Sequence, residues 1–232
     1  MRLPPGQHAV EGFPRFGTHL HHPPPAVPPA PVIEIRGAVH EPIDVPVEEL
    51  ANLPRRHLTA DFHCVAGWSA TDLEWDGVAF ETFYTRLIEP SLLGDAPVTH
   101  LAFGGLDGYR WQGLLEDALA PDVMIADRLA GRPLDSDHGA PARLVSPRQY
   151  GHVSVKHLAR IEVLTAEALA DYRAASGAAR FTLRSPLIRP HRRARVWEEE
   201  RHRYLPGWAL RPVYRQLIAP IRFLSARGQR EP

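Results

Sequence analysis

The sequence predicts an α+β fold built from mixed β-sheets and short helices. Many short segments place apolar residues at every second position, as half-buried strands do. The helical segments between them are brief, and the connecting loops hold many of the 24 prolines and 17 glycines. A regular alternation of strand and helix, which would indicate a doubly wound parallel sheet, is not seen. We therefore expect α+β rather than α/β architecture, followed by a helical tail at the C-terminus.

The first expected unit is an N-terminal arm of residues 1–31, rich in proline, glycine and histidine. Its prolines favour an extended, polyproline-like path. The arm is either a free tail or a segment that packs along the domain. His19, His21 and His22 lie in it without a distant set of ligands, so a solvated loop is favoured over a metal cluster.

A domain of residues 32–170 follows, with strands and short helices. The expected strands cover residues 32–39, 43–47, the segment leading to Cys64, 98–103, 122–127, 143–145 and 161–164. Short helices are expected to begin at Pro46, to cover 80–88 and to cover 114–119. Gly131-Arg132-Pro133 is typical of a turn.

A C-terminal extension of residues 171–232 is rich in arginine. Residues 191–204 are predicted to form a highly charged helix. From Leu210 to Leu224, apolar residues recur at helical spacing, and Pro212 and Pro220 are expected to start and kink this second helix. Its apolar stripe either docks on its own domain, which we favour slightly, or contacts a membrane surface or a protein partner.

The overall charge is balanced, with 27 basic and 27 acidic residues, and gives no case for nucleic-acid binding. Hydrophobic residues make up 44% of the chain, enough for a sizeable core. No apolar run approaches the ~20 residues of a membrane-spanning helix. The beginning of the chain lacks a secretory or twin-arginine signal, so the sequence predicts a cytoplasmic protein.

The single cysteine, Cys64, is the central candidate for chemistry. It has no second cysteine with which to form an intrachain disulfide, so it is either a buried small hydrophobe or a reactive thiol. The residues before it alternate as in a strand, and Ala66-Gly67-Trp68-Ser69 is typical of a turn. A thiol at such a junction is where a scaffold presents a functional group.

Several motifs, in the same order, resemble the sulfite oxidase family of molybdopterin-dependent oxidoreductases, in its bacterial branch and over the catalytic domain alone. The motif around Cys64 resembles the family's molybdenum-ligand segment. The resemblance covers roughly residues 12–165 and rests on these stretches: Phe13–Gly17, His63–Ser69, Trp75–Val78, Gly105–Tyr109, His138–Val145, Tyr150–Gly151 and Ser154–Leu158.

The resemblance implies a molybdopterin-binding fold in which Cys64 ligates molybdenum and carries the catalytic role. Soft thiolate sulfur suits such a metal. Cationic and hydroxyl side chains suit the phosphate of the pterin, and glycines allow close approach of the backbone. The cofactor-binding residues that it implies are Arg15, His63, Gly105, His138, Arg143, Ser154 and Lys156.

The implied reaction is a two-electron oxygen-atom transfer on a small-molecule substrate of the sulfoxide or sulfite type. Sulfite oxidases proper carry Asn-Arg after Cys-Ala-Gly, whereas this chain has Trp68 and Ser69, which argues against sulfite. Trp68 resembles the branch that includes methionine sulfoxide reductases. No haem domain is present, so electrons would be exchanged with a separate partner.

Two alternatives from other classes remain open. In the first, Cys64 is the nucleophile of a hydrolase, although His63 would point to the opposite face of the strand and serve poorly as its base. In the second, the chain is a non-catalytic adaptor that binds its partner through the basic amphipathic tail.

Overall fold

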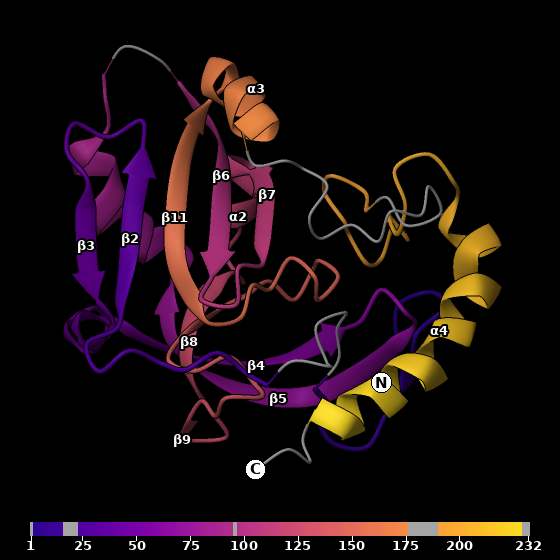
Figure 1. The fold of residues 1–232 in the computed structure, drawn as a ribbon. Helices are drawn as coiled ribbons and strands as arrows, with labels where there is room; N and C mark the ends of the chain where they lie inside the picture. Colours follow the sequence, from indigo (N-terminus) through magenta and orange to yellow (C-terminus); the bar gives the residue numbers. More distant parts are fainter. Residues whose placement is uncertain (1, 16–22, 95–96, 176–189, 229–232) are drawn as a thin grey trace.

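The computed structural model describes residues 2–15, 23–94, 97–175 and 190–228, and it contains two mixed β-sheets (Figure 1). The five-stranded sheet has the order β3-β2-β11-β6-β7. Its strands are β2 (Val32–Gly37), β3 (Ile43–Pro46), β6 (Val98–Gly105), β7 (Arg110–Leu114) and β11 (Leu158–Thr165). β2 and β11 are parallel and the other neighbours are antiparallel.

The six-stranded sheet is organised around β5, a strand of 12 residues. β4 and β8 pair with β5 in antiparallel fashion, whereas the short β1 joins it in parallel. Its strands are β1 (His8–Ala9), β4 (Arg55–His63), β5 (Trp68–Ala79), β8 (Met124–Leu129), β9 (Arg132–Pro133) and β10 (Arg143–Val145). Because β1 belongs to the arm, residues 8–9 extend this sheet rather than forming a free tail.

Short helices connect the strands, and the largest hydrophobic cluster joins both sheets. The helical elements are η1 (Val47–Asn52), α1 (Phe80–Phe83), the π-helical η2 (Tyr84–Ile88), η3 (Glu89–Ser91), α2 (Leu115–Ala118) and α3 (Ala166–Ala175). Ile35 and Ile161 of one sheet and Ile125 of the other are fully buried in this cluster. Each such side chain contributes about 1.5–3 kcal/mol through burial. The α+β class with mixed sheets is confirmed.

The structure also corrects the expected elements. β5, β7 and α3 were not expected from the sequence. The turn placed over residues 66–69 ends at Gly67, and Trp68 already begins β5. The strand expected at 122–127 begins at Met124 and runs to Leu129. His19, His21 and His22 lie outside the described residues.

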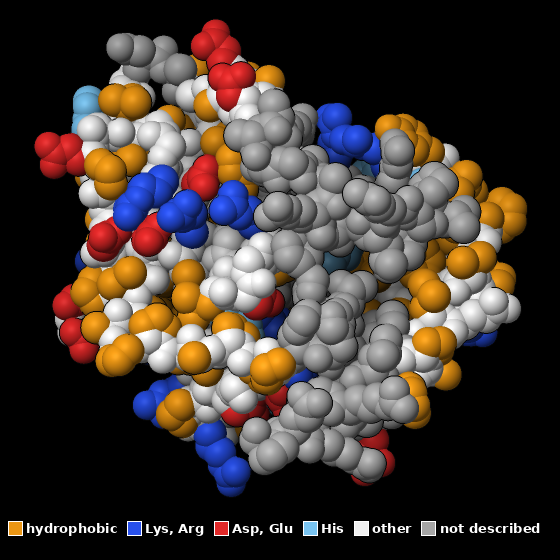
Figure 2. All heavy atoms as spheres, in the orientation of Figure 1, with side chains coloured by type: hydrophobic (Ala, Val, Ile, Leu, Met, Phe, Trp, Pro, Cys, Tyr) orange, Lys and Arg blue, Asp and Glu red, His pale blue; other side chains and the backbone are white. Residues whose placement is uncertain are grey.

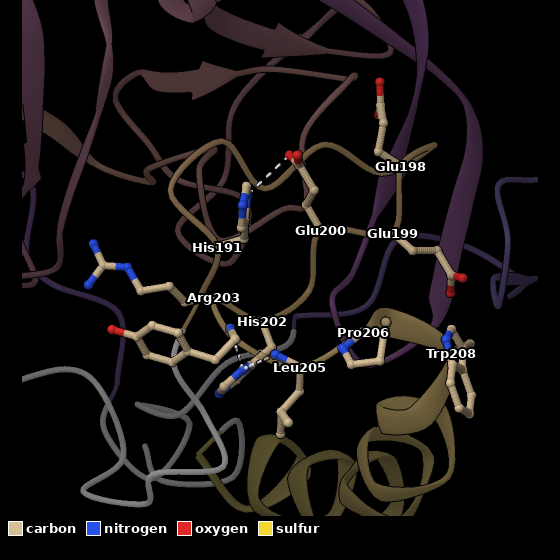
Figure 3. Close-up of a pocket in the computed structure, with 11 residues that line it drawn as sticks. His191, Glu198, Glu199, Glu200, His202, Arg203, Leu205, Pro206 and Trp208 are labelled. Carbon is tan, nitrogen blue, oxygen red and sulfur yellow. Dashed lines mark hydrogen bonds and ion pairs between the residues drawn. The ribbon is translucent and has the colours of Figure 1, made fainter.

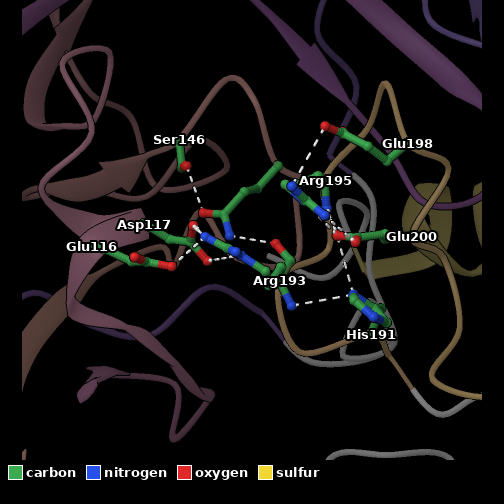
Figure 4. Close-up of polar contacts among 9 residues, drawn as sticks. Glu116, Asp117, Ser146, His191, Arg193, Arg195, Glu198 and Glu200 are labelled. Carbon is green, nitrogen blue, oxygen red and sulfur yellow. Dashed lines mark hydrogen bonds and ion pairs between the residues drawn. The ribbon is translucent and has the colours of Figure 1, made fainter. Parts of the chain in front are cut away.

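No helix forms at residues 191–204, so that prediction was wrong. Ala194 and Glu199 have positive φ angles of 52° and 53°, which an α-helix does not allow. The charged side chains instead anchor an irregular segment to the domain (Figure 4). Arg193 donates to Asp117 at 2.7 Å and to Glu116 at 2.5 Å. The tail therefore pairs with α2 instead of forming pairs along a helix.

The second tail helix is confirmed as α4 (Gly207–Gly228), but it begins at Gly207, so Pro212 lies inside it together with Pro220 and does not start it. Leu210 and Tyr214 are each 4% exposed, and Ile218 packs against a cluster that contains Cys64. The stripe thus docks on its own domain, as favoured from the sequence; the side chains of Ile221 and Leu224 lie outside the described part. Figure 2 shows hydrophobic side chains on the surface at the right, where α4 lies. Trp208, Val213 and Phe223 of this helix are exposed. None of the described helices is long and apolar enough to cross a membrane.

Candidate active site

Cys64 lies in the turn of the β4–β5 hairpin, directly after the last residue of β4. The turn is closed by the amide of Gly67, which donates to the carbonyl of Cys64 at 2.9 Å. Gly67 has a φ of +107°, which favours glycine over any residue with a Cβ atom. The expected junction of strand and turn is confirmed, and the Cys64 side chain is 7% exposed within it.

A chain of polar contacts fixes the residues beside the thiol. The Gln7 amide group donates to the Cys64 carbonyl at 3.1 Å, and the Ser69 hydroxyl donates to the Gln7 side chain at 3.0 Å. The His63 Nδ1 atom lies 2.7 Å from the Ser69 hydroxyl oxygen. Because that hydroxyl gives its proton to Gln7, Nδ1 is the donor to it. Burial lowers the pKa of His63, which keeps the ring neutral.

The environment of Cys64 disfavours a role as a free nucleophile. Burial raises the pKa of the thiol to about 12, opposed by a backbone hydrogen bond from Ala66 and by the charge of Arg201. The thiol is therefore protonated when nothing is bound to it, and a protonated thiol is a poor nucleophile. The side chain of His63 is directed to Ser69, which leaves it no role as a base for Cys64.

A second group of site residues surrounds Arg143, whose side chain is fully buried. Its guanidinium donates to the carbonyls of His138 at 2.9 Å and Ser154 at 3.2 Å. Three aromatic rings flank it at 5.1–5.7 Å, those of Phe13, Phe62 and Trp75. Burial lowers the pKa of Arg143 to about 9. Within the described part of the chain, no carboxylate pairs with this guanidinium.

Lys156 adds a second, partly buried cation to this group, and it is the only lysine of the chain. Its ammonium donates to the carbonyl of Asp137 at 2.6 Å. Burial and the nearby charges of Arg143 and Arg15 lower the pKa of Lys156 to about 7, opposed by the charges of Asp137 and Asp107. Arg15 lies 3.6 Å from the carboxylate of Asp137, whose side chain is 30% exposed. Two acids, Asp137 and Asp107, thus lie near three cations, so the cations outnumber the acids in this group.

Two glycines allow the backbone to approach these cations. A Cβ atom on Gly139, which has a φ of +107°, would lie 3.1 Å from Lys156 and 3.2 Å from Arg143. A Cβ atom on Gly105 would lie 2.4 Å from the carbonyl oxygen of Lys156. Both positions therefore require glycine as long as the two cations keep their places.

Phe62 and Gly151 connect the two groups. The Gly151 amide donates to the His63 carbonyl at 2.7 Å, and a Cβ atom on Gly151 would lie 1.9 Å from the Phe62 ring. The Phe62 ring lies 5.6 Å from the Arg143 guanidinium and 5.8 Å from the Trp68 ring. One continuous region of the protein thus runs from the thiol to the buried cations.

The structure brings most of the residues expected from the sequence together, with two exceptions. Ser154 contributes its carbonyl, whereas its hydroxyl accepts a hydrogen bond from the Ser146 amide at 3.1 Å. His63 contacts Ser69, beside Cys64, and lies apart from the cation group. The cation group contains Arg15, Gly105, His138, Arg143 and Lys156.

Sequence reasoning missed the residues that the two ends of the chain bring to Cys64. These are Gln7 of the arm and Arg201 of the tail segment. The crowding of arginines after residue 190 was the only signal for Arg201. A surface hollow of about 330 Å³ is lined by the same tail segment, between His191 and Trp208, and includes none of the expected site residues (Figure 3).

The titration of Lys156 can be measured directly, because a single lysine gives a single side-chain signal. In the cofactor-free protein, we expect the ¹³Cε signal of labelled lysine to titrate near pH 7 instead of its ordinary 10.5. A lysine whose pKa is lowered by folding destabilises the folded state at every pH at which it is charged, and the full cost is present below pH 7. That cost is relieved as the pH rises from about 7 to 10.5, so stability should rise over this interval, at about 1.4 kcal/mol for each unit of pKa shift.

The control for this titration is Lys156→Met, which should flatten the rise in stability relative to the wild type. The difference between the two proteins cancels the groups that they share. A lysine signal that titrates near 10.5, together with equal pH profiles of melting temperature, would contradict the buried placement of this ammonium.

Comparison with known proteins identifies the family. The sequence profile described as oxidoreductase molybdopterin binding domain matches residues 21–172, about two thirds of the chain. The chain therefore belongs to this family of molybdopterin-dependent oxidoreductases, as its motifs indicated. The arm before residue 21 and the tail after residue 172 lie outside the match.

Individual relatives agree with this assignment. The chain is 31% identical, over 58% of its length, to a protein-methionine-sulfoxide reductase catalytic subunit of Gluconobacter oxydans, of which 47% is covered. It is 29% identical to an uncharacterized oxidoreductase of Bacillus subtilis, over 56% of this chain and 63% of that one. The chain thus spans roughly half to two thirds of the length of these relatives.

A solved structure is also similar, the sulfane dehydrogenase SoxCD of Paracoccus pantotrophus. The match has a TM-score of 0.50 and 25% sequence identity, and covers 59% of this chain and 39% of that one. It supports the sulfite-oxidase-like fold expected from the motifs.

The residues present fit the molybdopterin cofactor of this family. A phosphate carries negative charge, and the fully buried guanidinium of Arg143, which has no carboxylate partner in the described part of the chain, lies near Lys156 and Arg15. Cys64 supplies the soft sulfur that such a metal prefers. Both kinds of donor are preformed, with Cys64 and Arg143 in buried positions.

Proposed function

We propose that this protein is a molybdopterin enzyme that reduces sulfoxides by two-electron oxygen-atom transfer, with Cys64 as the protein ligand of the metal. The observation that carries the proposal is the pairing of one buried thiol with a separate group of cations, in which Arg143 is fully buried and has no carboxylate partner among the described residues. Bound molybdopterin supplies the redox chemistry, and the chain supplies its ligand, its anchor and a dry environment.

The roles of the residues follow from their places. Arg143, Lys156 and Arg15 would hold the phosphate, with Gly105 and Gly139 allowing close approach. Cys64 would hold the metal, in a turn fixed by Gln7 and Gly67. His63 and Ser69 would support that turn through their hydrogen bond, and the neutral His63 adds no charge beside the metal.

Sulfoxides are favoured as the substrate class for two reasons. Trp68 and Ser69 follow the Cys64 turn, where sulfite oxidases have an asparagine and an arginine, so the local sequence lacks the cation that would bind sulfite. A relative at 31% identity carries the name of a protein-methionine-sulfoxide reductase. The balanced reaction is R₂S=O + 2e⁻ + 2H⁺ → R₂S + H₂O. The electrons would come from a separate protein partner.

The test begins with metal analysis of the purified protein by mass spectrometry and with the fluorescence of oxidised pterin. About one molybdenum and one pterin per chain are expected. A reduced dye should then be oxidised when methionine sulfoxide is added, with sulfite as the comparison substrate. Stoichiometric cofactor with activity on sulfite alone would refute the substrate, and an absence of both molybdenum and pterin after expression with a molybdenum supply would refute the enzyme class.

A further inference from the structure

Arg201, in the tail outside the family match, is buried beside the Cys64 turn. Only 1% of it is exposed. One terminal nitrogen donates to the carbonyl of Val65, the residue after Cys64, and the other donates to the carbonyl of Pro5 at 3.2 Å. A single side chain therefore joins the tail to the metal-ligand turn and to the N-terminal arm.

The surroundings of Arg201 leave a net positive charge next to the thiol. Its guanidinium lies 4.9 Å from the centre of the Tyr150 ring and 3.7 Å from the carboxylate of Glu199. That carboxylate is bound more closely by Arg211, at 2.5 and 2.7 Å. Arg201 and Arg211 thus share Glu199, so these three side chains carry a net charge of +1. Tyr214 of α4 is buried on the same side of Cys64.

Glycines in the arm and in the turn make this arrangement fit. Gly6 has a φ of +70°, and a Cβ atom on it would lie 2.9 Å from both the Arg201 and the Arg211 guanidinium groups. A Cβ atom on Gly67 would lie 3.0 Å from the Gly6 carbonyl oxygen. The arm, the turn and the tail therefore approach one another as closely as their backbones allow.

We propose that Arg201 is a positioning residue of the metal site: it holds the Cys64 turn in place and sets the reduction potential of the metal through its charge. The proposal rests on the role of Cys64 as metal ligand. A fixed positive charge stabilises the electron-rich state of a nearby metal, so it raises the reduction potential. The tail thereby supplies a cation near the site. Residues 68–79, which directly follow the Cys64 turn, contain no lysine or arginine.

The test compares the wild type with Arg201→Gln, Arg201→Lys and, as a matched control, Arg203→Gln. Arg203 lies two residues away on the same segment and is exposed. The first measurement is the molybdenum midpoint potential of the holoenzyme, followed by electron paramagnetic resonance during a redox titration. Arg201→Gln should shift the potential to more negative values, Arg201→Lys should stay near the wild type because it keeps the charge, and Arg203→Gln should not differ.

The second measurement needs no bound cofactor. Alkylation of Cys64 by a maleimide reports how firmly the turn is held, because it is the only thiol of the chain. Arg201→Gln should react at least about tenfold faster than the wild type, which corresponds to about 1.4 kcal/mol of lost restraint on the turn. Arg201→Lys can keep only one of the two carbonyl bonds, so an intermediate rate is expected.

Each outcome bears on the proposal. An unchanged midpoint potential in Arg201→Gln, or an equal shift in Arg201→Lys, would overturn the electrostatic role, and an unchanged alkylation rate would overturn the positioning role. If Arg201→Gln does not fold, Arg201→Lys still tests both roles. Failure of the proposed function is seen separately, as a wild type without molybdenum, and in that case the alkylation rates still decide whether Arg201 holds the turn.

Discussion

Replacement of Cys64 by alanine is expected to abolish turnover while the protein remains folded. The substitution removes the only thiolate that the chain can offer to the metal. The cation group, which lies apart from Cys64, would still hold the phosphate, so some molybdenum and most of the pterin should remain. Loss of one buried sulfur atom should cost roughly 1 kcal/mol of stability, a typical value for a single substitution.

The measurements are dye-coupled turnover, metal content and the electron paramagnetic resonance spectrum of the reduced enzyme. Cys64→Ser should behave like Cys64→Ala in turnover, because a hydroxyl oxygen replaces the soft sulfur poorly. Thr71→Ala, a change in the same hairpin but outside the site, is the control and should keep wild-type turnover. A Cys64→Ala protein with wild-type activity would remove Cys64 from the metal site.

Loss of Arg143 or Lys156 is expected to weaken the binding of the cofactor. Under the proposed function, Arg143→Met and Lys156→Met would each remove a charge-assisted contact to the phosphate, worth about 1.5–3 kcal/mol. The affinity for the cofactor should fall roughly ten- to hundredfold. Cofactor-free Lys156→Met should nonetheless be at least as stable as the wild type below pH 7, because it no longer places a charge where burial and two arginines disfavour it.

Pterin content per chain, measured by fluorescence, checks this expectation. Arg160→Met is the matched control, because Arg160 forms a partly exposed ion pair with Glu34 in the neighbouring sheet. A second comparison uses adjacent glycines. Gly105→Ala should lower the pterin content because its Cβ atom would displace Lys156, whereas the Cβ atom of Gly104→Ala meets only an ordinary contact at 3.5 Å. Undiminished pterin in Arg143→Met and Lys156→Met would indicate cations with a purely structural role.

Features that depend on neighbouring residues were predictable from the sequence. The strand before Cys64 and the turn after it follow from alternation and from Gly67, and the fold class follows from many such short segments. The stripe of α4 was also predictable, because its buried residues Leu210 and Tyr214 are one turn apart.

Features that depend on distant contacts were not predictable. Residues 191–204 have the composition of a charged helix. In the fold, however, Arg193 forms an ion pair with Asp117, which is 76 residues earlier and could not be inferred from the local sequence. Nothing in the sequence distinguishes Arg201 from the other arginines of the tail; only the fold brings it to the carbonyl of Val65. Ser154 matched a motif position, but the motif does not reveal that its hydroxyl accepts a hydrogen bond from the Ser146 amide.

The contacts of Arg201 also have a consequence for the order in which the protein matures. Its two carbonyl partners are 136 and 196 residues earlier in the chain. At about 5–20 residues per second, a ribosome needs on the order of ten seconds or more to travel from the Cys64 codon to the Arg201 codon. During that time the hairpin and both sheets have emerged, but the side of the thiol that the tail covers is still open. The tail is thus the last segment to pack over a nearly complete site. The single thiol is therefore more exposed to solvent in the nascent chain than in the mature protein.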